Sequence, residues 1–341
     1  MNRSELLFLY DLNDANPNGD PLDENKPRID EETETNIVTD VRLKRTIRDY
    51  IDQKYDDEIF VKEKPSSSGE GIQDAKTRAL NFLDDKVYET LDEAKKDLNE
   101  SILNSCIDVR LFGATIPLDV KIGKKNKSGS SIFTGPVQFR MGRSLHKVEL
   151  THIKGTGAFA SSDGKTQKTF REEYILPYSL IAFYGVVNEV AAEDTHLRDE
   201  DVNKLLDAMW NGTKNLITRS KFGQTPRLLL QIEYSEDYYF IGDLNNKICV
   251  THELNNDKEI RKISDVKLDM GKLLENIEKS KDKINKIYYK IDDNVSFVDN
   301  LSIIDEINSY GIDVEELDLW RMVFYDKRCS GFWCVGWLCI F

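Results

Sequence analysis

The segment 5–51 constrains the fold most, because a strand, a polar turn and a basic helix follow one another within it. Residues 6–10 are apolar, too few for a helix and bounded by polar residues, so they predict a largely buried strand. Residues 16–21 include two prolines, two asparagines and a glycine, which predicts a tight, exposed turn. A helix is expected to begin with Thr39 or Asp40 as its N-cap. The apolar face of this helix would consist of Leu43, Ile47, Tyr50 and Ile51.

The remaining faces of the predicted helix are basic. Arg42, Lys44, Arg45 and Arg48 lie within two helical turns, and we expect them to be exposed cations beside the turn. Such a ridge would suit the phosphates of a nucleic acid. Four basic residues on a helix are also common on an ordinary solvated face, so the pattern alone leaves both interpretations open.

Charge is distributed unevenly along the chain. The formal net charge is -14, yet residues 110–173 hold twelve Lys or Arg against five Asp or Glu. Residues 211–230 hold Lys214, Arg219, Lys221 and Arg227 and no acidic residue. An acidic body with basic central segments is typical of a protein that binds a polyanion along one groove. The alternative is that the lysines only keep surface loops hydrated.

The chain lacks the sequence signals that are usual for several classes of function. The five cysteines, at positions 106, 249, 329, 334 and 339, include no C-x-x-C pair, so we expect free thiols and no metal site. No G-x-x-x-x-G-K-[ST] segment is present, which argues against nucleotide hydrolysis, and no cofactor is expected. The amino terminus shows no signal peptide, which predicts a cytoplasmic protein without a membrane partner.

Periodicity places further elements along the chain. We expect helices at 72–82, 91–103, 199–216, 270–280 and 302–309, and strands at 105–116, 137–141, 174–187, 227–234, 247–250 and 286–291. Residues 121–131, rich in lysine, glycine and serine, would form a mobile loop, and the Asp163-Gly164 turn signal predicts a protruding hairpin. Strand, helix, strand, strand, helix, strand, with insertions, is the order of a ferredoxin-like or RNA-recognition-motif fold, so the expected class is α+β.

The amino-acid sequence of the first segment is characteristic enough to compare with known families. DANPNGDPLDENKPRID followed by NIVTDVRLKRTIRDYI resembles the amino terminus of the CRISPR-associated backbone subunits of type I-B Cascade, the Csh-type family numbered seven among Cas proteins, of the RAMP superfamily. Further blocks resemble the same family in the same order: DVRLFGA at 108–114, GPVQ at 135–138 with GRSLH at 142–146, ILPYSL at 175–180, and WNGT at 210–213 through RSK at 219–221. The resemblance covers residues 1 to about 235.

This resemblance implies a fold with three named parts. A palm, modified from the ferredoxin-like or RNA-recognition-motif fold, would comprise residues 1–53 and 105–250, with helical fingers inserted at 54–104. A thumb hairpin at about 146–173 would reach over the bound guide. Residues 251–320 would form a C-terminal α/β segment, and 321–341 an atypical apolar tail rich in cysteine and tryptophan. An RNP1-type aromatic octamer is missing, so base stacking on the sheet face is not expected.

The resemblance also implies a function. The chain would be a non-catalytic subunit of a type I-B interference complex that binds the CRISPR guide RNA and polymerises along it, for antiviral defence against foreign DNA. Its partners would be the guide RNA, the target DNA strand through guide pairing, other copies of itself in a helical filament and other Cascade subunits. The alternative is a metal-dependent ribonuclease, in which the acidic loop with Asp11, Asp14, Asp20 and Asp23 would hold Mg²⁺.

Backbone recognition is the expected mode of RNA binding, because contacts to phosphates position an RNA without selecting its sequence. No catalytic residue or metal ligand is predicted. The residues expected to contact RNA are Asn18, Gly19, Arg42, Lys44, Arg45, Arg48, Gln138, Arg143, Ser144, Arg219, Ser220 and Lys221.

Overall fold

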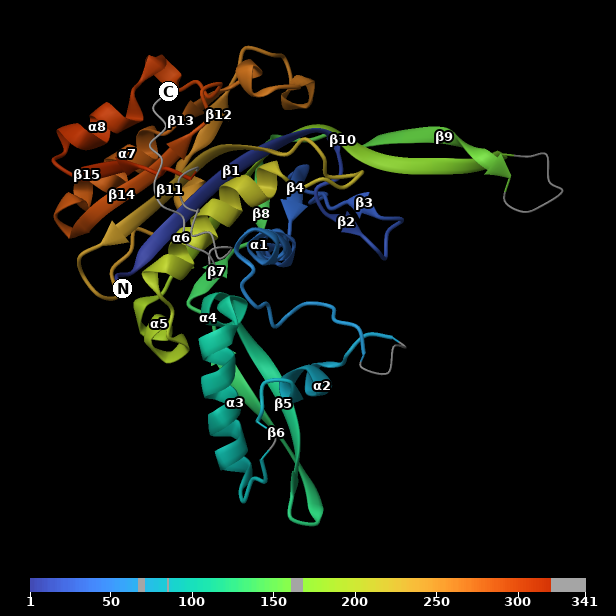
Figure 1. Cartoon of the computed structure of the whole chain (residues 1–341). Coiled ribbons are helices and arrows are strands. Elements are labelled where there is room, and N and C mark those ends of the chain that lie inside the picture. Colours follow the sequence, from blue (N-terminus) through green and yellow to red (C-terminus); the bar gives the residue numbers. More distant parts are fainter. Residues whose placement is uncertain (67–70, 85, 161–167, 320–341) are drawn as a thin grey trace, which may run out of the picture.

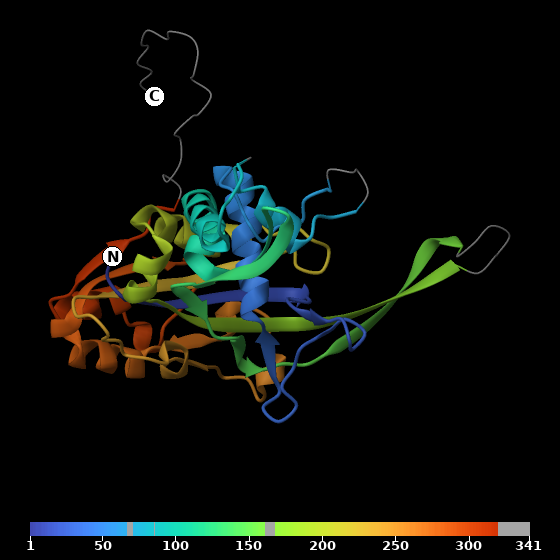
Figure 2. The ribbon, with the colours of Figure 1, turned by 90° about the horizontal axis from the view of Figure 1, so that it is seen from below.

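The computed structural model describes residues 1–66, 71–84, 86–160 and 168–319. Within them one nine-stranded sheet runs in the order β15 (Asp313–Glu316), β14 (Ile284–Ile291), β11 (Thr225–Tyr234), β1 (Ser4–Ala15), β10 (Lys168–Val187), β8 (Gly142–Lys147) and β4 (Thr35–Val38). Two more strands, β7 (Val137–Phe139) and β9 (Thr151–Ala160), also pair with β10. All these pairs are antiparallel except β14 with β15. Helices lie on both faces of the sheet (Figures 1 and 2), so the chain has the expected α+β architecture.

Strand β1 lies at the centre of the sheet. Phe8 is paired with Phe183 of β10 on one side and with Leu229 of β11 on the other. Every residue from 4 to 12 is buried, because packed elements cover both faces and leave the strand no solvated side. The prediction of a buried strand at 6–10 is confirmed, and the strand extends beyond the apolar run at both ends.

Alternate side chains of β1 enter two separate cores. Phe8 and Leu12 belong to a core shared with helix α1 (Asp40–Tyr55) and helix α6 (Asp199–Asp207). Leu7 and Leu9 belong to a core shared with helices α7 (Gly271–Lys279) and α8 (Ile303–Ser309). Fully burying one such side chain contributes about 1.5–3 kcal/mol, so both layers of helices are held firmly on the sheet.

Helix α1 is the basic helix expected from the sequence. Thr39 caps the start of the helix by accepting a hydrogen bond from the backbone N–H of Arg42. The helix ends at Tyr55, and the next residue, Asp56, has a left-handed backbone conformation with a φ of 55°. Leu43, Ile47 and Ile51 are buried and Tyr50 is half-buried. The predicted cap and apolar face are confirmed.

Helix α6 follows the short helix α5 (Glu189–Thr195) and continues through a π-helical turn over Ala208–Gly212. The helix predicted at 199–216 is therefore confirmed, with a change of winding inside it. Trp210 is buried in the core, as expected. The strands predicted at 137–141, 174–187 and 227–234 correspond to β7, β10 and β11.

A separate layer stands beside the sheet in Figure 1. It consists of α2 (Ala75–Leu80), α3 (Leu91–Ser105), α4 (Ile107–Phe112), β5 (Gly113–Ile122) and β6 (Lys125–Thr134). These elements share a core of their own that includes Leu98, Ile102 and Leu118. The helices predicted at 72–82 and 91–103 are confirmed, the first of them in shortened form.

One expectation for this layer is partly wrong and a second is wrong. Of the strand predicted at 105–116, residues 107–112 form the helix α4, in which Asp108 and Arg110 are buried in ion pairs, whereas residues 113–116 begin the strand β5. Residues 121–131 belong to the β5–β6 hairpin, and a turn at Gly123 with a φ of 60° joins its strands. Gly129 of this hairpin lies against Lys95 of α3, so packing rather than composition determines its structure.

Strand β10 takes part in two structures. Its residues 176–187 pair with β1, while residues 168–175 pair with β9 in a hairpin that projects from the sheet (Figure 1). Residues 161–167 lie outside the described residues. The hairpin stands where the thumb was expected at about 146–173, and its role stays a prediction.

The C-terminal part adds the two-stranded pair β12 (Cys249–Thr251) and β13 (Lys267–Asp269) to α7, β14, α8 and β15. Short 3₁₀ turns occur at Leu244–Lys247, Asp257–Glu259, Ile263–Asp265, Lys281–Lys283 and Val298–Asn300. The elements predicted at 247–250, 270–280, 286–291 and 302–309 are confirmed, whereas the predicted tail at 321–341 lies outside the described residues. Cys106 and Cys249 are free thiols.

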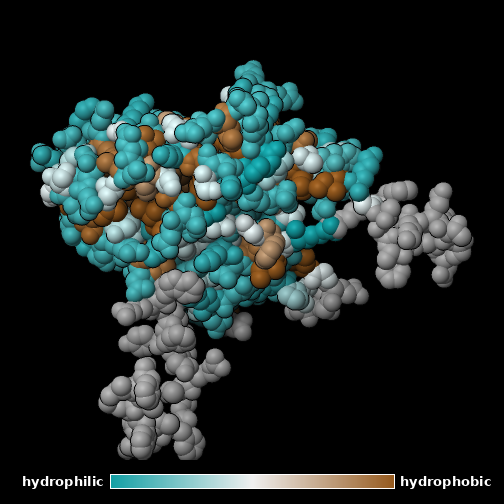
Figure 3. Space-filling model, turned by 90° about the horizontal axis from the view of Figure 1, so that it is seen from above, coloured by the Kyte–Doolittle hydropathy of each residue, from teal (hydrophilic) through white to brown (hydrophobic). Residues whose placement is uncertain are grey.

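The surface seen from above is largely hydrophilic, with hydrophobic residues gathered in patches over the C-terminal strands and helices at the left of the view (Figure 3). None of the helices in the described part of the chain is long and apolar enough to cross a membrane.

Candidate nucleic-acid interface

Three of the four cations expected on α1 are paired with carboxylates. The Lys44–Asp40, Arg45–Asp49 and Arg48–Asp108 pairs measure 3.1, 2.7 and 3.0 Å. Arg48 is only 13% exposed, and its guanidinium lies over the ring of Phe112. Lys44 is only 12% exposed, so the expectation that Lys44 and Arg48 are exposed cations is wrong. These pairs leave Arg42 as the cation of this helix that can still accept an anionic partner.

Arg42 forms no ion pair with a carboxylate among the described residues. One terminal N–H donates to the hydroxyl of Thr46, one turn along the helix, at 2.9 Å. Its Nε is buried and has no hydrogen-bond partner in the described structure. Burial lowers the pKa of Arg42, because the charged form is removed from water. An unpaired buried donor costs free energy, and an anion would supply its missing acceptor.

Lys221 brings a second cation to this place, from the loop 218–224. Its Nζ lies 3.1 Å from the hydroxyl of Ser220, and it too pairs with no carboxylate among the residues described. Burial, followed by the charge of Arg42, lowers the pKa of Lys221. Burial lowers the pKa of Arg42 more than the charge of Asp49 raises it, and neither cation is ion-paired among the described residues. An anion placed beside both cations would relieve their repulsion.

Two contacts attach the basic loop to the rest of the structure. The backbone N–H of Asn16 donates to the carbonyl of Ser220 at 2.8 Å, which joins the loop to the end of β1. Arg219 pairs with Glu173 of β10 at 3.1 Å, which joins it to the base of the projecting hairpin. The predicted residues Arg219, Ser220 and Lys221 are thereby brought beside the turn after β1 and the base of the projecting hairpin.

The turn after β1 contains a small hairpin of β2 (Gly19–Asp20) and β3 (Lys26–Pro27). A Cβ atom on Gly19 would lie 2.1 Å from the side chain of Asn25, so only glycine fits there. Asn18 is half-buried, and its side-chain oxygen lies 3.5 Å from the hydroxyl of Thr39, the cap of α1. The predicted Asn18-Gly19 corner therefore lies at the start of the helix that carries Arg42.

The three residues predicted on β7 and β8 differ in exposure and in their hydrogen-bond or ion-pair partners. Gln138 is exposed and accepts a hydrogen bond from Lys44 at 3.1 Å. Arg143 is half-exposed and pairs with Asp30 at 2.8 Å. Ser144 is buried: its hydroxyl donates to the carbonyl of His146 at 2.7 Å and accepts from the backbone N–H of Asn36 at 2.9 Å. The expectation that Ser144 contacts RNA does not fit this position, because its hydroxyl joins β4 to β8.

The acidic residues of the ribonuclease alternative do not converge. Asp11 is buried against Arg227 at 2.9 Å, accepts a hydrogen bond from Tyr178 at 3.0 Å, and has its pKa raised by burial. Asp20 pairs with Arg28 at 2.6 Å and Asp23 with Lys26 at 2.7 Å. Within the described ranges no group of three His, Cys, Asp or Glu residues is placed to hold a metal ion.

Asn16 belongs to the site although the sequence did not single it out for RNA contact. Its amide nitrogen donates to the backbone carbonyl of Asn25 at 2.7 Å, while its amide oxygen is buried without a partner in the described structure. Its position in the asparagine-rich turn was the signal that could have identified it.

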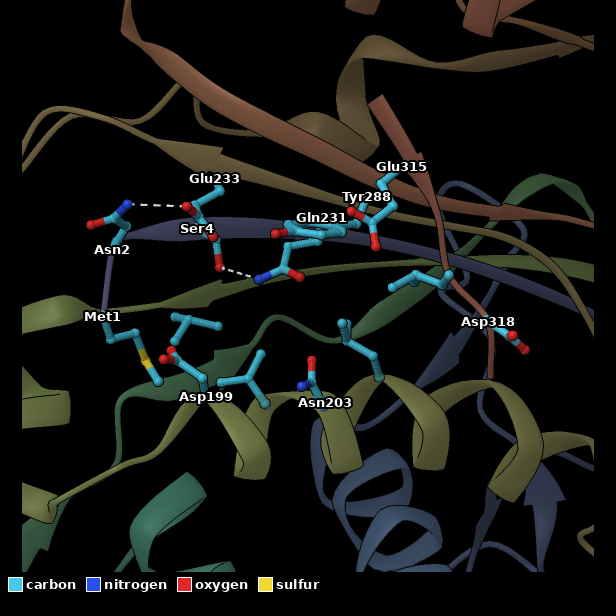
Figure 4. Close-up of a pocket in the computed structure, with 14 residues that line it drawn as sticks. Met1, Asn2, Ser4, Asp199, Asn203, Gln231, Glu233, Tyr288, Glu315 and Asp318 are labelled. Atoms are coloured by element: carbon cyan, nitrogen blue, oxygen red, sulfur yellow. Dashed lines mark hydrogen bonds between the residues drawn. The ribbon is translucent and has the colours of Figure 1, made fainter. Parts of the chain in front are cut away.

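A cleft of about 640 Å³ lies elsewhere, between α6 and the sheet (Figure 4). Its lining includes the carboxylates of Asp199, Glu233, Glu315 and Asp318 and none of the residues predicted to contact RNA. An anionic cleft repels phosphates, so the surroundings of Arg42 and Lys221 are the better candidate for a nucleic-acid interface.

Known protein sequences resemble this chain over most of its length. The model of a family described as CRISPR-associated protein Cas7 matches residues 2–271. A protein of Haloferax volcanii named CRISPR-associated protein Cas7 is 34% identical to this chain, in an alignment that covers 94% of this chain and 97% of that protein.

Two solved structures resemble the fold. A chain from a structure titled CRISPR RNA-guided surveillance complex, pre-nicking, has a TM-score of 0.52 at 10% identity, over 90% of this chain and 100% of that chain. A chain from a structure titled CRISPR RNA-guided surveillance complex has a TM-score of 0.51 at 11% identity, over 90% and 97% of the two chains.

Proposed function

Because the chain belongs to the CRISPR-associated protein Cas7 family, we propose that it binds the CRISPR guide RNA as a backbone subunit of a type I-B interference complex, Cascade. In this role it has no catalytic chemistry of its own. It positions the guide, and pairing of the guide with the target DNA strand selects the sequence to be attacked. Other Cascade subunits and further copies of the chain complete the complex in the cell's cytoplasm.

The pair of cations formed by Arg42 and Lys221 is the observation that carries this proposal. A phosphate between them would provide acceptors for the unpaired Nε of Arg42 and for Lys221, and it would reduce the repulsion between the two charges. The neighbouring Asn18-Gly19 corner adds polar groups at the start of α1. None of these contacts selects a base, which suits a guide whose sequence varies.

The strand order supports an RNA-recognition-motif-like palm. Strands β11, β1 and β10, with β7 and β8 next to β10, follow the order fourth, first, third, second of a βαββαβ unit whose helices are α1 and α6. The projecting hairpin of β9 and β10 would be the thumb. Because β5 and β6 share a core with α3, we assign residues 54–134 to the fingers, although 105–134 were expected in the palm.

Titration of a labelled, unstructured single-stranded RNA at several salt concentrations tests the proposal. Arg42→Gln and Lys221→Gln should each lower the affinity roughly 10- to 100-fold, because each removes a charged hydrogen bond worth about 1.5–3 kcal/mol. The slope of log K against log[salt] should fall by about 0.7 for each phosphate contact removed.

Arg45→Gln is the matched control, because Arg45 lies on the same helix and is already paired with Asp49. It should change the affinity much less than Arg42→Gln does. Equal affinities for the wild type and the Arg42 and Lys221 variants, or an affinity independent of salt, would reject backbone recognition at this site.

A further inference from the structure

The basic loop exposes a large aromatic side chain. Phe222 is 68% exposed. None of the aromatic ring pairs among the described residues includes Phe222, so its ring has no aromatic partner in that part of the chain. A ring left in water forgoes the stabilisation that burial would provide, which marks it as a candidate contact for another molecule.

The backbone holds this ring in a defined place. The N–H groups of Lys221 and Phe222 both donate to the carbonyl of Thr218, at 3.1 and 2.9 Å. Gly223 follows with a φ of 86°, which lets the chain turn directly after the ring, and Gln224 is buried. The turn is therefore anchored on both sides of Phe222, so little ordering would be needed when a ligand binds.

The ring is adjacent in the chain to the proposed phosphate contact. Lys221 and Phe222 are consecutive residues, so their Cα atoms are about 3.8 Å apart. Each nucleotide carries a phosphate and a base on one ribose. A bound strand therefore presents a row of phosphates and, beside it, a row of bases. A strand whose phosphate lies between Arg42 and Lys221 would therefore bring bases close to the ring of Phe222.

We propose that Phe222 is a stacking platform for an unpaired base of the bound RNA, an inference that rests on the proposed function. Every base has a π-face, so stacking on an aromatic side chain tolerates any sequence and adds affinity without restricting the guide. It requires an exposed base face, and bases within a continuous duplex are already covered by their neighbours. The loop thus combines a phosphate contact at Lys221 with a base contact at Phe222.

The charges around the ring favour a nucleic acid over a protein partner. Lys221, the residue before the ring, forms no ion pair with a carboxylate in the described part of the chain, whereas Arg219 is paired with Glu173 and Arg227 with Asp11. Lysine is depleted at the cores of protein interfaces, whereas basic grooves with interspersed aromatic rings are the usual surface for single-stranded nucleic acids.

The test compares the binding of intact single-stranded RNA and of an abasic RNA with the same backbone, using the full chain. Phe222→Ala should weaken binding of intact RNA about 5- to 100-fold, which corresponds to the loss of one stacked base. It should leave binding of abasic RNA and the salt dependence unchanged. Phe222→Trp should retain the affinity, and its fluorescence should be quenched by intact RNA and not by abasic RNA.

Two matched variants separate stacking from general apolar contact. Phe222→Leu keeps an apolar side chain without a ring and should weaken binding nearly as much as Phe222→Ala does. Ile217→Ala removes an apolar side chain that is 79% exposed on the same segment and should change the affinity less than twofold.

Three outcomes would overturn the stacking role. These are an unchanged affinity of Phe222→Ala for intact RNA, an equal loss on intact and abasic RNA, and a change in self-association with no change in RNA affinity, which would assign the ring to a protein contact. If the wild-type chain bound no single-stranded RNA, the proposed function would fail together with the stacking role. Binding at full strength by Phe222→Ala would overturn the stacking role alone.

Discussion

Arg45 and Arg48 stand on the same helix in very different surroundings. Arg45 is 55% exposed and pairs with Asp49 at the surface. Arg48 pairs with Asp108, which is 1% exposed and also accepts hydrogen bonds from the backbone N–H groups of Phe60 and Val61. The first pair is strongly screened by water, whereas the second joins α1 to helix α4 in a buried setting.

We therefore expect Arg48→Gln to lower the free energy of unfolding by about 3 kcal/mol, because it leaves the carboxylate of Asp108 buried without its cation. Arg45→Gln, the matched control, should lower it by less than about 1 kcal/mol. Urea denaturation followed by circular dichroism measures both values. If the two variants shared one denaturation midpoint, the structural role assigned to Arg48 would be wrong.

One buried ion pair joins helix α4 to helix α6. Nε and a terminal nitrogen of Arg110 each lie 2.8 Å from an oxygen of Asp201, and both side chains are buried. Arg110 also donates to the carbonyl of Leu103 in α3 at 2.9 Å. The pair therefore connects the layer formed by α2, α3, α4, β5 and β6 to a helix packed on the central sheet.

Asp201→Asn should selectively loosen the attachment of the layer that contains α3 and α4. Asparagine can still accept the capping hydrogen bond that Asp201 receives from the N–H of Arg198, so the substitution removes mainly the charge. Hydrogen exchange should accelerate in α3 and α4 while β1 and β11 keep their protection, with a cost of about 3 kcal/mol.

The paired variant Arg110→Met with Asp201→Leu serves as the control. Removing both charges leaves no unpaired ion, so this variant should lose less stability than Asp201→Asn. Exchange that accelerates equally in β1 would show that the pair stabilises the whole molecule rather than the attachment of one layer.

The proposed function requires several copies of the chain on one RNA. A single interface around Arg42 and Lys221 spans only a few nucleotides, and contacts between unlike surfaces of identical chains extend into an open helical array. Complexes with RNAs of increasing length should therefore grow in steps of one 39.3 kDa chain, measured as native mass by light scattering. A fixed one-to-one complex at every RNA length would contradict polymerisation along the guide.

Elements with local signals could be predicted from the amino-acid sequence alone. The apolar run at 6–10 specified β1, and Thr39 with the spacing of Leu43, Ile47 and Ile51 specified the start and the buried face of α1. Capping and periodicity act over a few residues, so they can be interpreted without knowing the fold. The family blocks and the basic segments likewise pointed to Arg42 and to the loop 219–221.

The availability of a charged residue to a ligand depends on contacts between distant parts of the chain. Arg48 is neutralised by Asp108, 60 positions away in the sequence, which lies in the buried helix of residues 107–112 where a strand was expected. Lys221 forms no ion pair with a carboxylate in the described part of the chain, and burial together with the charge of Arg42 lowers its pKa, so it remains available to an anion. A charge's neighbours across the fold set its pairing and burial, and local sequence patterns do not contain that information.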